Sequence, residues 1–195
     1  MLADSMKFQE AEHFNISHIE PVTHIYGPGS RFTVWVQGCT LGCKGCWNEE
    51  MWPKRPRTLI HRVELLQQIL RAPNIDGITI LGGEPLQQPE NTLWLLAEIR
   101  KHSSLSIMTY TGYEPHELKQ MGHWKPLLEF ADIIVAGRYQ ENKRNTYLRW
   151  RGSDNQQIIY PENSRLDQYS DESNDLEIII SEHGAITTLG YPEQQ

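Results

Sequence analysis

The three cysteines of the chain lie within one short stretch, at positions 39, 43 and 46. Their order, C-x-x-x-C-x-x-C, directly follows the apolar run 32–37. Gly38, Gly42 and Gly45 give the intervening backbone the freedom to turn the three sulfurs toward a single point. Because thiolates are ligands for zinc and for iron–sulfur clusters, the spacing predicts a metal-binding loop after a strand.

Four interpretations compete for these thiols. An odd cysteine count and the absence of a signal-like segment over residues 1–30 argue against a disulfide framework. Structural zinc takes four closed ligands, and the nearest histidines, His24 and His61, stand outside the usual spacing. An iron–sulfur cluster on three cysteines leaves one iron open for a further ligand. We favour the cluster over zinc, and zinc over three unrelated core cysteines.

A second motif, Gly82-Gly83-Glu84-Pro85, follows the short apolar run 77–81, which is typical of a buried strand. In parallel α/β proteins, ligands bind at the carboxyl ends of strands. The two glycines allow a close approach of backbone to ligand, and Glu84 offers an acceptor to an amino group. Alone, such a tetrapeptide is an ordinary turn. Its position one strand–helix unit after the cysteines makes it a candidate binding segment.

Together, the two motifs resemble the cluster loop and the Gly-Gly-Glu-Pro motif of the radical S-adenosylmethionine (radical SAM) enzymes. Three further segments resemble the anaerobic ribonucleotide reductase activating proteins, which are glycyl-radical activases: Gly27–Arg31, Thr109–Tyr113 and Trp150–Gln156. The resemblance covers about residues 25–160. It implies a 4Fe–4S cluster on Cys39, Cys43 and Cys46, with S-adenosylmethionine on the open iron.

The resemblance also implies roles for other residues. Gly82, Gly83 and Glu84 hold the methionyl amine of S-adenosylmethionine, and Arg138 pairs with its carboxylate. Trp47 either stacks on the adenine or belongs to the local core. Thr109 bonds the ribose or is structural, as threonines closing a strand often are. No catalytic residue is expected beyond the cofactors.

The segment that follows the fourth predicted strand raises two further points. Ala136 stands where the activases carry an aspartate, which leaves the partner open between anaerobic ribonucleotide reductase and an unrelated protein. Residues 138–151 interleave basic and aromatic side chains, a pattern seen in nucleic-acid binding, but the match to the activases favours a partner-docking or site-closing loop. The candidate docking residues are Arg151, Gly152, Ser153, Asn155 and Gln156.

The implied function is reductive cleavage of S-adenosylmethionine to a 5′-deoxyadenosyl radical, which takes a hydrogen atom from a glycine of a partner protein. A low-potential donor such as flavodoxin would supply the electron. Two alternatives remain open: a small-molecule radical SAM enzyme resembling 7-carboxy-7-deazaguanine synthase, and a non-catalytic iron–sulfur or zinc interaction module.

Composition sets outer limits on these interpretations. A chain of 195 residues is expected to form one main folded domain. A formal charge of −7 argues against a general nucleic-acid binder. No apolar run reaches the length of a membrane span, and the clustered thiols suit a reducing compartment. We therefore expect a cytoplasmic protein without membrane contact.

The elements that must position these residues alternate along the chain. Apolar runs predict strands at 32–37, 77–81, 105–110, 132–136 and 156–160, and helical spacing predicts helices at 58–72, 91–102, 114–120 and 124–130. This alternation predicts parallel β/α units. They are too few for a closed barrel, and the resemblance implies an incomplete TIM-type barrel.

The predicted boundaries divide the chain into four parts. Residues 1–20 are expected to form an N-terminal arm, 21–160 the radical SAM core, 161–175 an acidic linker and 176–195 a C-terminal β-hairpin. The hairpin lies beyond the part of the chain that resembles the activases.

Overall fold

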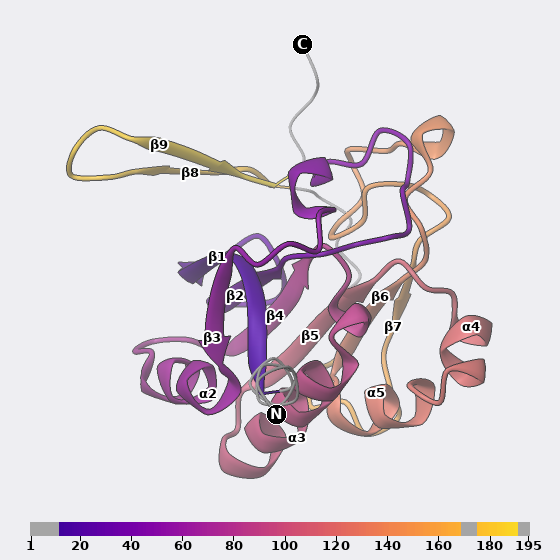
Figure 1. Ribbon diagram of the computed structural model, residues 1–195, viewed down its shortest axis with the longest axis horizontal. Helices are drawn as coiled ribbons and strands as arrows, with labels where there is room; N and C mark the ends of the chain where they lie inside the picture. Colours follow the sequence, from indigo (N-terminus) through magenta and orange to yellow (C-terminus); the bar gives the residue numbers. More distant parts are fainter. Residues whose placement is uncertain (1–11, 169–174, 191–195) are drawn as a thin grey trace, which may run out of the picture.

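The computed structural model describes residues 12–168 and 175–190 of the chain. Seven strands form one sheet in the order β3-β1-β2-β4-β5-β6-β7 (Figure 1). The strands of this sheet are β1 His13–Thr23, β2 Arg31–Val36, β3 Thr58–His61, β4 Gly77–Gly82, β5 Ser106–Thr111, β6 Ile133–Ala136 and β7 Gln157–Ile159. The central strands β2, β4, β5 and β6 are parallel, whereas β1, β3 and β7 pair antiparallel. The fold is therefore mixed α/β with a parallel centre.

Four helices cover one face of this sheet. They are α2 Arg62–Arg71, α3 Pro89–His102, α4 Pro115–Gln120 and α5 Trp124–Phe130. Three single 3₁₀ turns, η1 Glu49–Met51, η2 Pro85–Gln87 and η3 Glu141–Lys143, lie in the loops. All four helices contribute to one buried apolar cluster with alternate residues of the central strands. No helix of the described residues has both the length and the apolar character that crossing a membrane requires.

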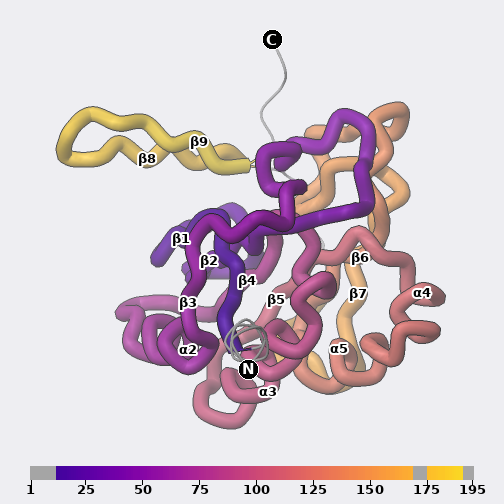
Figure 2. Tube along the Cα trace, in the orientation of Figure 1, coloured from indigo at the N-terminus to yellow at the C-terminus, as the bar shows by residue number. Residues whose placement is uncertain are grey.

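The other face of the sheet is covered by loops and by the C-terminal segment. Trp35 of β2 and Leu81 of β4 pack there with Tyr26 and Leu189, while Met108 of β5 packs with residues of β6. Strand alternation therefore separates a helix-covered face from a loop-covered face. The tube in Figure 2 shows the loops crowding one end of the sheet.

Most of the predicted core elements are confirmed. The strands expected at 32–37, 77–81, 105–110 and 132–136 are present as β2, β4, β5 and β6. The helices expected at 91–102, 114–120 and 124–130 are present as α3, α4 and α5. These elements succeed because their apolar residues repeat with the period of the structure they adopt.

The helix predicted from Thr58 is wrong over its first turn. Residues Thr58–His61 form the edge strand β3, which pairs with His13–Ile16 of β1. The helix begins after His61, whose Nδ1 accepts a hydrogen bond from Val63 N at 3.3 Å. Leu59, predicted to lie on the apolar stripe of that helix, is exposed. Pairing with a distant strand overrides the local pattern here.

Two further predictions require correction. Residues 13–20, expected to belong to an arm, form most of β1, which lies inside the sheet between β3 and β2. The fifth strand, β7, runs antiparallel to β6, because a loop and not a helical crossover connects them. The remainder of the predicted arm, residues 1–11, lies outside the described residues.

The motif Gly27–Arg31 has a structural role at the amino ends of the strands. Arg31 is completely buried and donates hydrogen bonds to Pro28 O at 3.2 Å and to Thr79 Oγ1 at 3.2 Å. Its Nη1 also donates to Ser106 Oγ at 2.5 Å. This segment therefore ties the starts of β2, β4 and β5 together, at the end of the sheet away from the cysteines.

Hydrogen bonds attach the C-terminal part of the chain to the rest of the molecule, both at the first described part of the predicted linker and at the base of the hairpin. The first described part of the predicted linker is held against the sheet, since Arg165 N donates to Asp132 Oδ1 at 2.7 Å. Strands β8 Glu177–Ile180 and β9 Ile186–Leu189 pair antiparallel as a hairpin that projects from the molecule (Figure 1). Its base contacts the main sheet through buried Leu189 and through Gly190 N, which donates to Tyr26 Oη at 2.9 Å.

Candidate functional site

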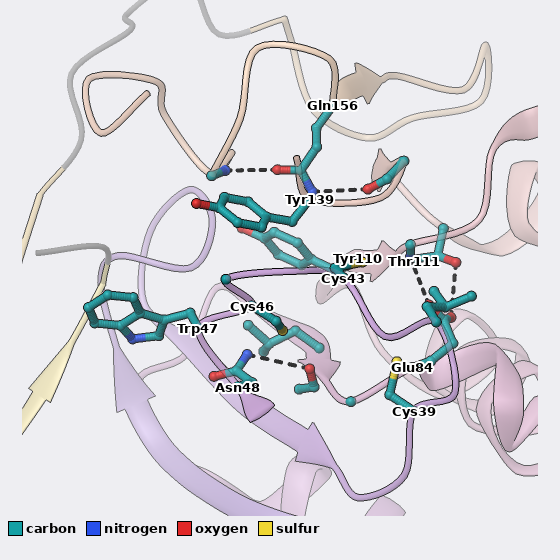
Figure 3. A pocket seen from close by; sticks show the side chains of 18 of the residues that line it. Cys39, Cys43, Cys46, Trp47, Asn48, Glu84, Tyr110, Thr111, Tyr139 and Gln156 are labelled. Carbon is teal, nitrogen blue, oxygen red and sulfur yellow. Dashed lines mark hydrogen bonds between the residues drawn. The ribbon is translucent and has the colours of Figure 1, made fainter. Parts of the chain in front are cut away.

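A cavity lies at the carboxyl ends of the parallel strands β2, β4, β5 and β6 (Figure 3). Four segments line it: the cysteine loop, the β4 loop with Gly82–Glu84, the end of β5, and the long connection from β6 to β7. The residues around it include Cys39, Leu41, Cys43, Cys46, Trp47, Asn48, Gly83, Glu84, Tyr110, Thr111, Tyr139, Arg144, Asn145, Thr146, Gly152 and Gln156. The two sequence motifs therefore meet in one place.

The cysteine loop is held by backbone hydrogen bonds to the segment that follows it. Gly38 N donates to Met51 O at 2.7 Å, and Cys39 N donates to Trp52 O at 3.0 Å. Gly38, Gly42 and Gly45 all have positive φ, between 61° and 104°. The backbone freedom expected from these glycines is therefore used, and the loop is fixed at its ends.

The three thiols are free, partly buried, and line the same cavity. Burial raises the pKa of Cys39 and of Cys43 above the ordinary thiol value. Among the described residues, no three His, Cys, Asp or Glu side chains converge closely enough to bind one metal ion. The convergence of the three sulfurs on one bound group stays a prediction. A donor set of three thiols spread around a cavity fits a four-iron cluster, whose cysteine-bound irons occupy separate corners.

Gly82 and Gly83 bring the β4 loop into direct contact with the cysteine loop. A Cβ added to Gly83 would lie 2.4 Å from Gly38 O, and one added to Gly82 would lie 2.7 Å from Val36 N. Gly83 N donates to Val36 O at 2.8 Å, and Glu84 N donates to Gly38 O at 2.9 Å. The close approach that the glycines permit is therefore between two loops of this chain. It fixes the position of the cysteines relative to β4.

Glu84 occupies a fully enclosed position at the edge of the cavity, with 1% of its surface exposed. Its carboxylate accepts hydrogen bonds from Leu86 N at 2.9 Å, Thr111 Oγ1 at 2.9 Å and Gly112 N at 2.7 Å. Burial raises its pKa to about 7 against the opposing effect of these bonds. The Glu84 carboxylate thus joins the β4 loop to the end of β5. It was predicted to accept a hydrogen bond from the amine of a ligand, whereas the partners seen here belong to the chain itself.

Trp47 lies at the rim of the cavity and not in the core. Its surface is 41% exposed, and the guanidinium of Arg144 lies over its ring at 5.7 Å from the centroid. The local-core interpretation of this tryptophan is therefore wrong. Stacking on an adenine stays a prediction, for which the ring has an accessible position.

Two predicted ligand-binding side chains point elsewhere. Thr109 is buried, is not among the lining residues, and its Oγ1 lies 3.5 Å from Tyr110 O. Arg138 donates two hydrogen bonds to the carboxylate of Glu117, at 2.6 and 2.9 Å, and lowers the pKa of that carboxyl to about 2. The Arg138 guanidinium is thus paired in a bidentate fork with α4, and its bond to the carboxylate of a ligand stays a prediction.

The residues predicted to dock a partner fold inward. Ser153 is completely buried, Gly152 and Gln156 line the cavity, and Asn155 Nδ2 donates to Arg138 O at 2.8 Å. Arg151 Nη1 donates to Gln156 O at 3.3 Å. Of the two roles expected for this segment, closure of the site is the one that its geometry fits.

Sequence reasoning missed several lining residues. Leu41 lies between the first two cysteines, Asn48 follows the third, Tyr110 belongs to the Thr109–Tyr113 motif, and Tyr139 follows Arg138. Their proximity to recognised motifs was a usable signal. The side of the backbone on which each lies was not readable without the register of the strands.

Comparison with known proteins gives matches to a family model, to curated relatives and to a solved structure. Residues 25–159 match the model of a family described as a 4Fe-4S single cluster domain. The anaerobic ribonucleoside-triphosphate reductase-activating protein of Enterobacteria phage T4 is 34% identical over 149 residues, which are 74% of this chain and 92% of that protein. The protein of the same name from Pasteurella multocida is 34% identical over 158 residues, 76% and 96% of the two chains. Among solved structures, QueE from Escherichia coli matches 56% of this chain and 57% of its own, at 20% identity and a TM-score of 0.40.

Proposed function

Because this chain belongs to the family of the anaerobic ribonucleoside-triphosphate reductase-activating proteins, we propose that it binds a 4Fe–4S cluster and S-adenosylmethionine in this cavity and generates a glycyl radical on a partner protein. One observation supports the proposal above the others. The three free thiols and the Gly82–Glu84 loop line the same cavity at the carboxyl ends of parallel strands. Ligands gather at that end of the sheet in α/β proteins.

The residues of this chain divide the work of holding the cofactors. Cys39, Cys43 and Cys46 are the proposed cluster ligands. The backbone of the β4 loop, which Glu84 holds in place, is the proposed site for the methionyl amine. Trp47 offers a ring face for the adenine. Apolar and aromatic side chains, among them Leu41, exclude water from the space between them.

The chain itself supplies position and shelter for the reaction. A reduced cluster held by the three cysteines would supply the one electron that splits S-adenosylmethionine into methionine and a 5′-deoxyadenosyl radical, which would take a hydrogen atom from a glycine Cα of the partner. No proton transfer by a side chain is needed in this balance. The three thiols must lose their protons when the cluster binds. Because burial raises the pKa of Cys39 and of Cys43, this loss of protons is harder than for exposed thiols.

The relatives' names point to an anaerobic ribonucleoside-triphosphate reductase as the partner. Ala136 is completely buried, so the carboxylate that activases carry there is replaced by part of the apolar core. A flavodoxin-like protein is the proposed electron donor, and a reducing cytoplasm is the proposed location, since free thiols persist there. We assign the open sheet to the incomplete barrel of radical SAM enzymes, because its helices cover one face and leave the other to loops.

The proposal is tested by anaerobic reconstitution with iron and sulfide, followed by reduction in the presence of S-adenosylmethionine. We expect four irons per chain, 5′-deoxyadenosine as a product, and a glycyl radical detected by electron paramagnetic resonance on an added anaerobic ribonucleotide reductase. An intact cluster that yields no 5′-deoxyadenosine, with or without the reductase, would refute the enzymatic function. A product without a glycyl radical would refute only the choice of partner.

A further inference from the structure

The connection between β6 and β7, residues 137–156, lies over the cysteine loop. Glu141 Oε2 lies 3.0 Å from Nζ of Lys44, a residue of the cysteine loop between its second and third cysteines. The guanidinium of Arg144 lies over the ring of Trp47. Gly45 leaves room for this contact, because a Cβ added there would lie 2.8 Å from Glu141 Oε1. The cavity is thus closed on one side by a segment that touches the cluster loop at several points.

The side-chain amide of Gln156 holds this segment in place. Its Oε1 accepts hydrogen bonds from Gly152 N at 2.8 Å and from Ser153 N at 3.2 Å, while its Nε2 donates to Gly137 O at 3.1 Å (Figure 3). These bonds link the start of the connection, at the end of β6, to its last turn before β7. The Gln156 amide therefore links the two ends of a connection of about twenty residues at the wall of the cavity, beside the bond from Asn155 Nδ2 to Arg138 O.

The chemistry of these contacts suits an amide. Two backbone N–H groups need an acceptor and one backbone carbonyl needs a donor, and a carboxamide offers both on two separate atoms without a proton to gain or lose. Two glycines allow the backbone to reach the Gln156 amide. Gly137 has a φ of 112°, which favours glycine, and a Cβ added to Gly152 would lie 3.1 Å from the ring of Tyr139. Tyr139 in turn lines the cavity between Gln156 and the cysteine loop (Figure 3).

We propose that Gln156 is a positioning residue of the reaction: its amide fixes residues 137–156 over the cysteine loop and so sets the width of the space in which cofactor and substrate chain meet. This inference rests on the proposed function. A fixed segment holds the substrate glycine near the reactive carbon and keeps water out. Without it, S-adenosylmethionine would be cleaved with the radical lost to other hydrogen donors.

The first test uses the metal-free protein, so that it does not depend on activity. In Gln156→Met, which keeps the length of the side chain and removes all three hydrogen bonds, we expect faster hydrogen–deuterium exchange over residues 150–156 and about tenfold faster alkylation of Cys43 by iodoacetamide, because the segment that covers the cysteine loop opens more often. Gln157→Met, which alters the exposed neighbouring glutamine, is the matched control and should behave as the wild type. Equal exchange and alkylation in all three proteins would overturn the proposal.

A second variant guards against misfolding. Gln156→Glu keeps the acceptor for Gly152 N and Ser153 N but places a carboxylate oxygen against Gly137 O, so it breaks only the donor contact. If Gln156→Met does not fold, this variant decides the result by the same two measurements. A Gln156→Glu protein indistinguishable from the wild type would refute the positioning role of the amide.

The third measurement separates positioning from stability. In reconstituted, reduced protein with its partner, we expect Gln156 variants to form several times more 5′-deoxyadenosine per glycyl radical than the wild type, at unchanged iron content. An unchanged ratio in a variant with a loosened segment would overturn the positioning role. If the wild type itself forms no 5′-deoxyadenosine, the proposed function fails, while exchange and alkylation still report whether Gln156 holds the segment in place.

Discussion

At the scale of single residues, the three thiols carry the proposed chemistry, and the chain has no fourth cysteine to replace one of them. We expect Cys43→Ala to abolish the visible absorption of the iron–sulfur cluster, because two thiolates of one loop do not retain four irons. Lys44→Ala is the control, since that neighbouring side chain is 90% exposed and should leave the spectrum intact. Iron and sulfide analysis after reconstitution gives the answer, and four irons bound to Cys43→Ala would contradict the ligand assignment.

Glu84 makes a prediction about pH. Its pKa is raised to about 7 in the folded protein from an ordinary value of 4.5, with burial as the main cause. Between these values the folded state holds a proton that the unfolded state has released. The free energy of unfolding therefore falls as pH rises from about 4.5 to 7, by on the order of 3 kcal/mol from this group, and changes little above that range.

The comparison protein for this prediction is Glu84→Gln, which does not titrate at this position. Urea unfolding of the metal-free proteins at several pH values should show the decline between about pH 5 and pH 7 in the wild type but not in the variant. Parallel pH profiles for the two proteins would show that Glu84 does not titrate in this range. The Glu84→Gln change also removes one acceptor oxygen, so the variant should be less stable than the wild type at about pH 5.

At the scale of secondary-structure elements, the hairpin β8–β9 lies beyond residues 25–159, the part matched by the cluster family. Its base is packed and its tip is not. Leu189 is 6% exposed and contacts the cluster of Tyr26, Trp35 and Leu81, whereas Ile180 is 68% exposed. The hairpin is therefore joined to the rest of the molecule at its base, through Leu189 at the end of β9 and through Glu177 at the start of β8, whose carboxylate accepts a hydrogen bond from His24 N at 3.1 Å.

This contrast predicts unequal effects of truncating two apolar side chains. Leu189→Ala should lower the free energy of unfolding by about 2–4 kcal/mol, because it leaves a cavity beside Trp35. Ile180→Ala should change it by less than about 0.5 kcal/mol. Denaturant unfolding of the two variants checks this, and equal losses would mean that the base of the hairpin is not packed against the sheet.

At the scale of the whole molecule, Asp132 ties together parts that are distant in sequence. Its completely buried carboxylate accepts hydrogen bonds from Ile107 N of β5 at 2.7 Å, from Arg100 of α3 at 2.8 Å and from Arg165 N at 2.7 Å. The residues that follow the sheet are thereby fixed to its amino-terminal end. The Asp132 contacts therefore lie at the opposite end of the strands from the candidate site.

Removing this anchor should affect global stability. Asp132→Ala leaves the largely buried Arg100 without its ion-pair partner and three donors without an acceptor, so we expect a loss of about 3–5 kcal/mol. Glu98→Gln on the same helix, which breaks pairs with the more exposed Lys101 and His102, should cost less than about 1 kcal/mol. Thermal and urea unfolding compare the two, and similar losses would contradict the structural role of Asp132.

The sequence alone determined the central strands, most helices and the family. Strands β2, β4, β5 and β6 and helix α3 were predictable because burial imposes a period on consecutive residues. Prediction from the sequence failed at Thr58–His61 and at His13–Ile16, because these two segments become strands only by pairing with each other. That the three cysteines would lie together was predictable for a similar local reason, since they belong to one short contiguous motif.

Tertiary structure alone decided what each polar side chain near the site does. Arg138, expected to bind a ligand, pairs with Glu117 from another element, and Glu84 accepts hydrogen bonds from the end of β5. Gln156 faces Gly137 across a loop of about twenty residues. A side chain's type sets which bonds it can make, but its partners come from distant parts of the chain, and only the assembled sheet brings those parts within hydrogen-bond distance.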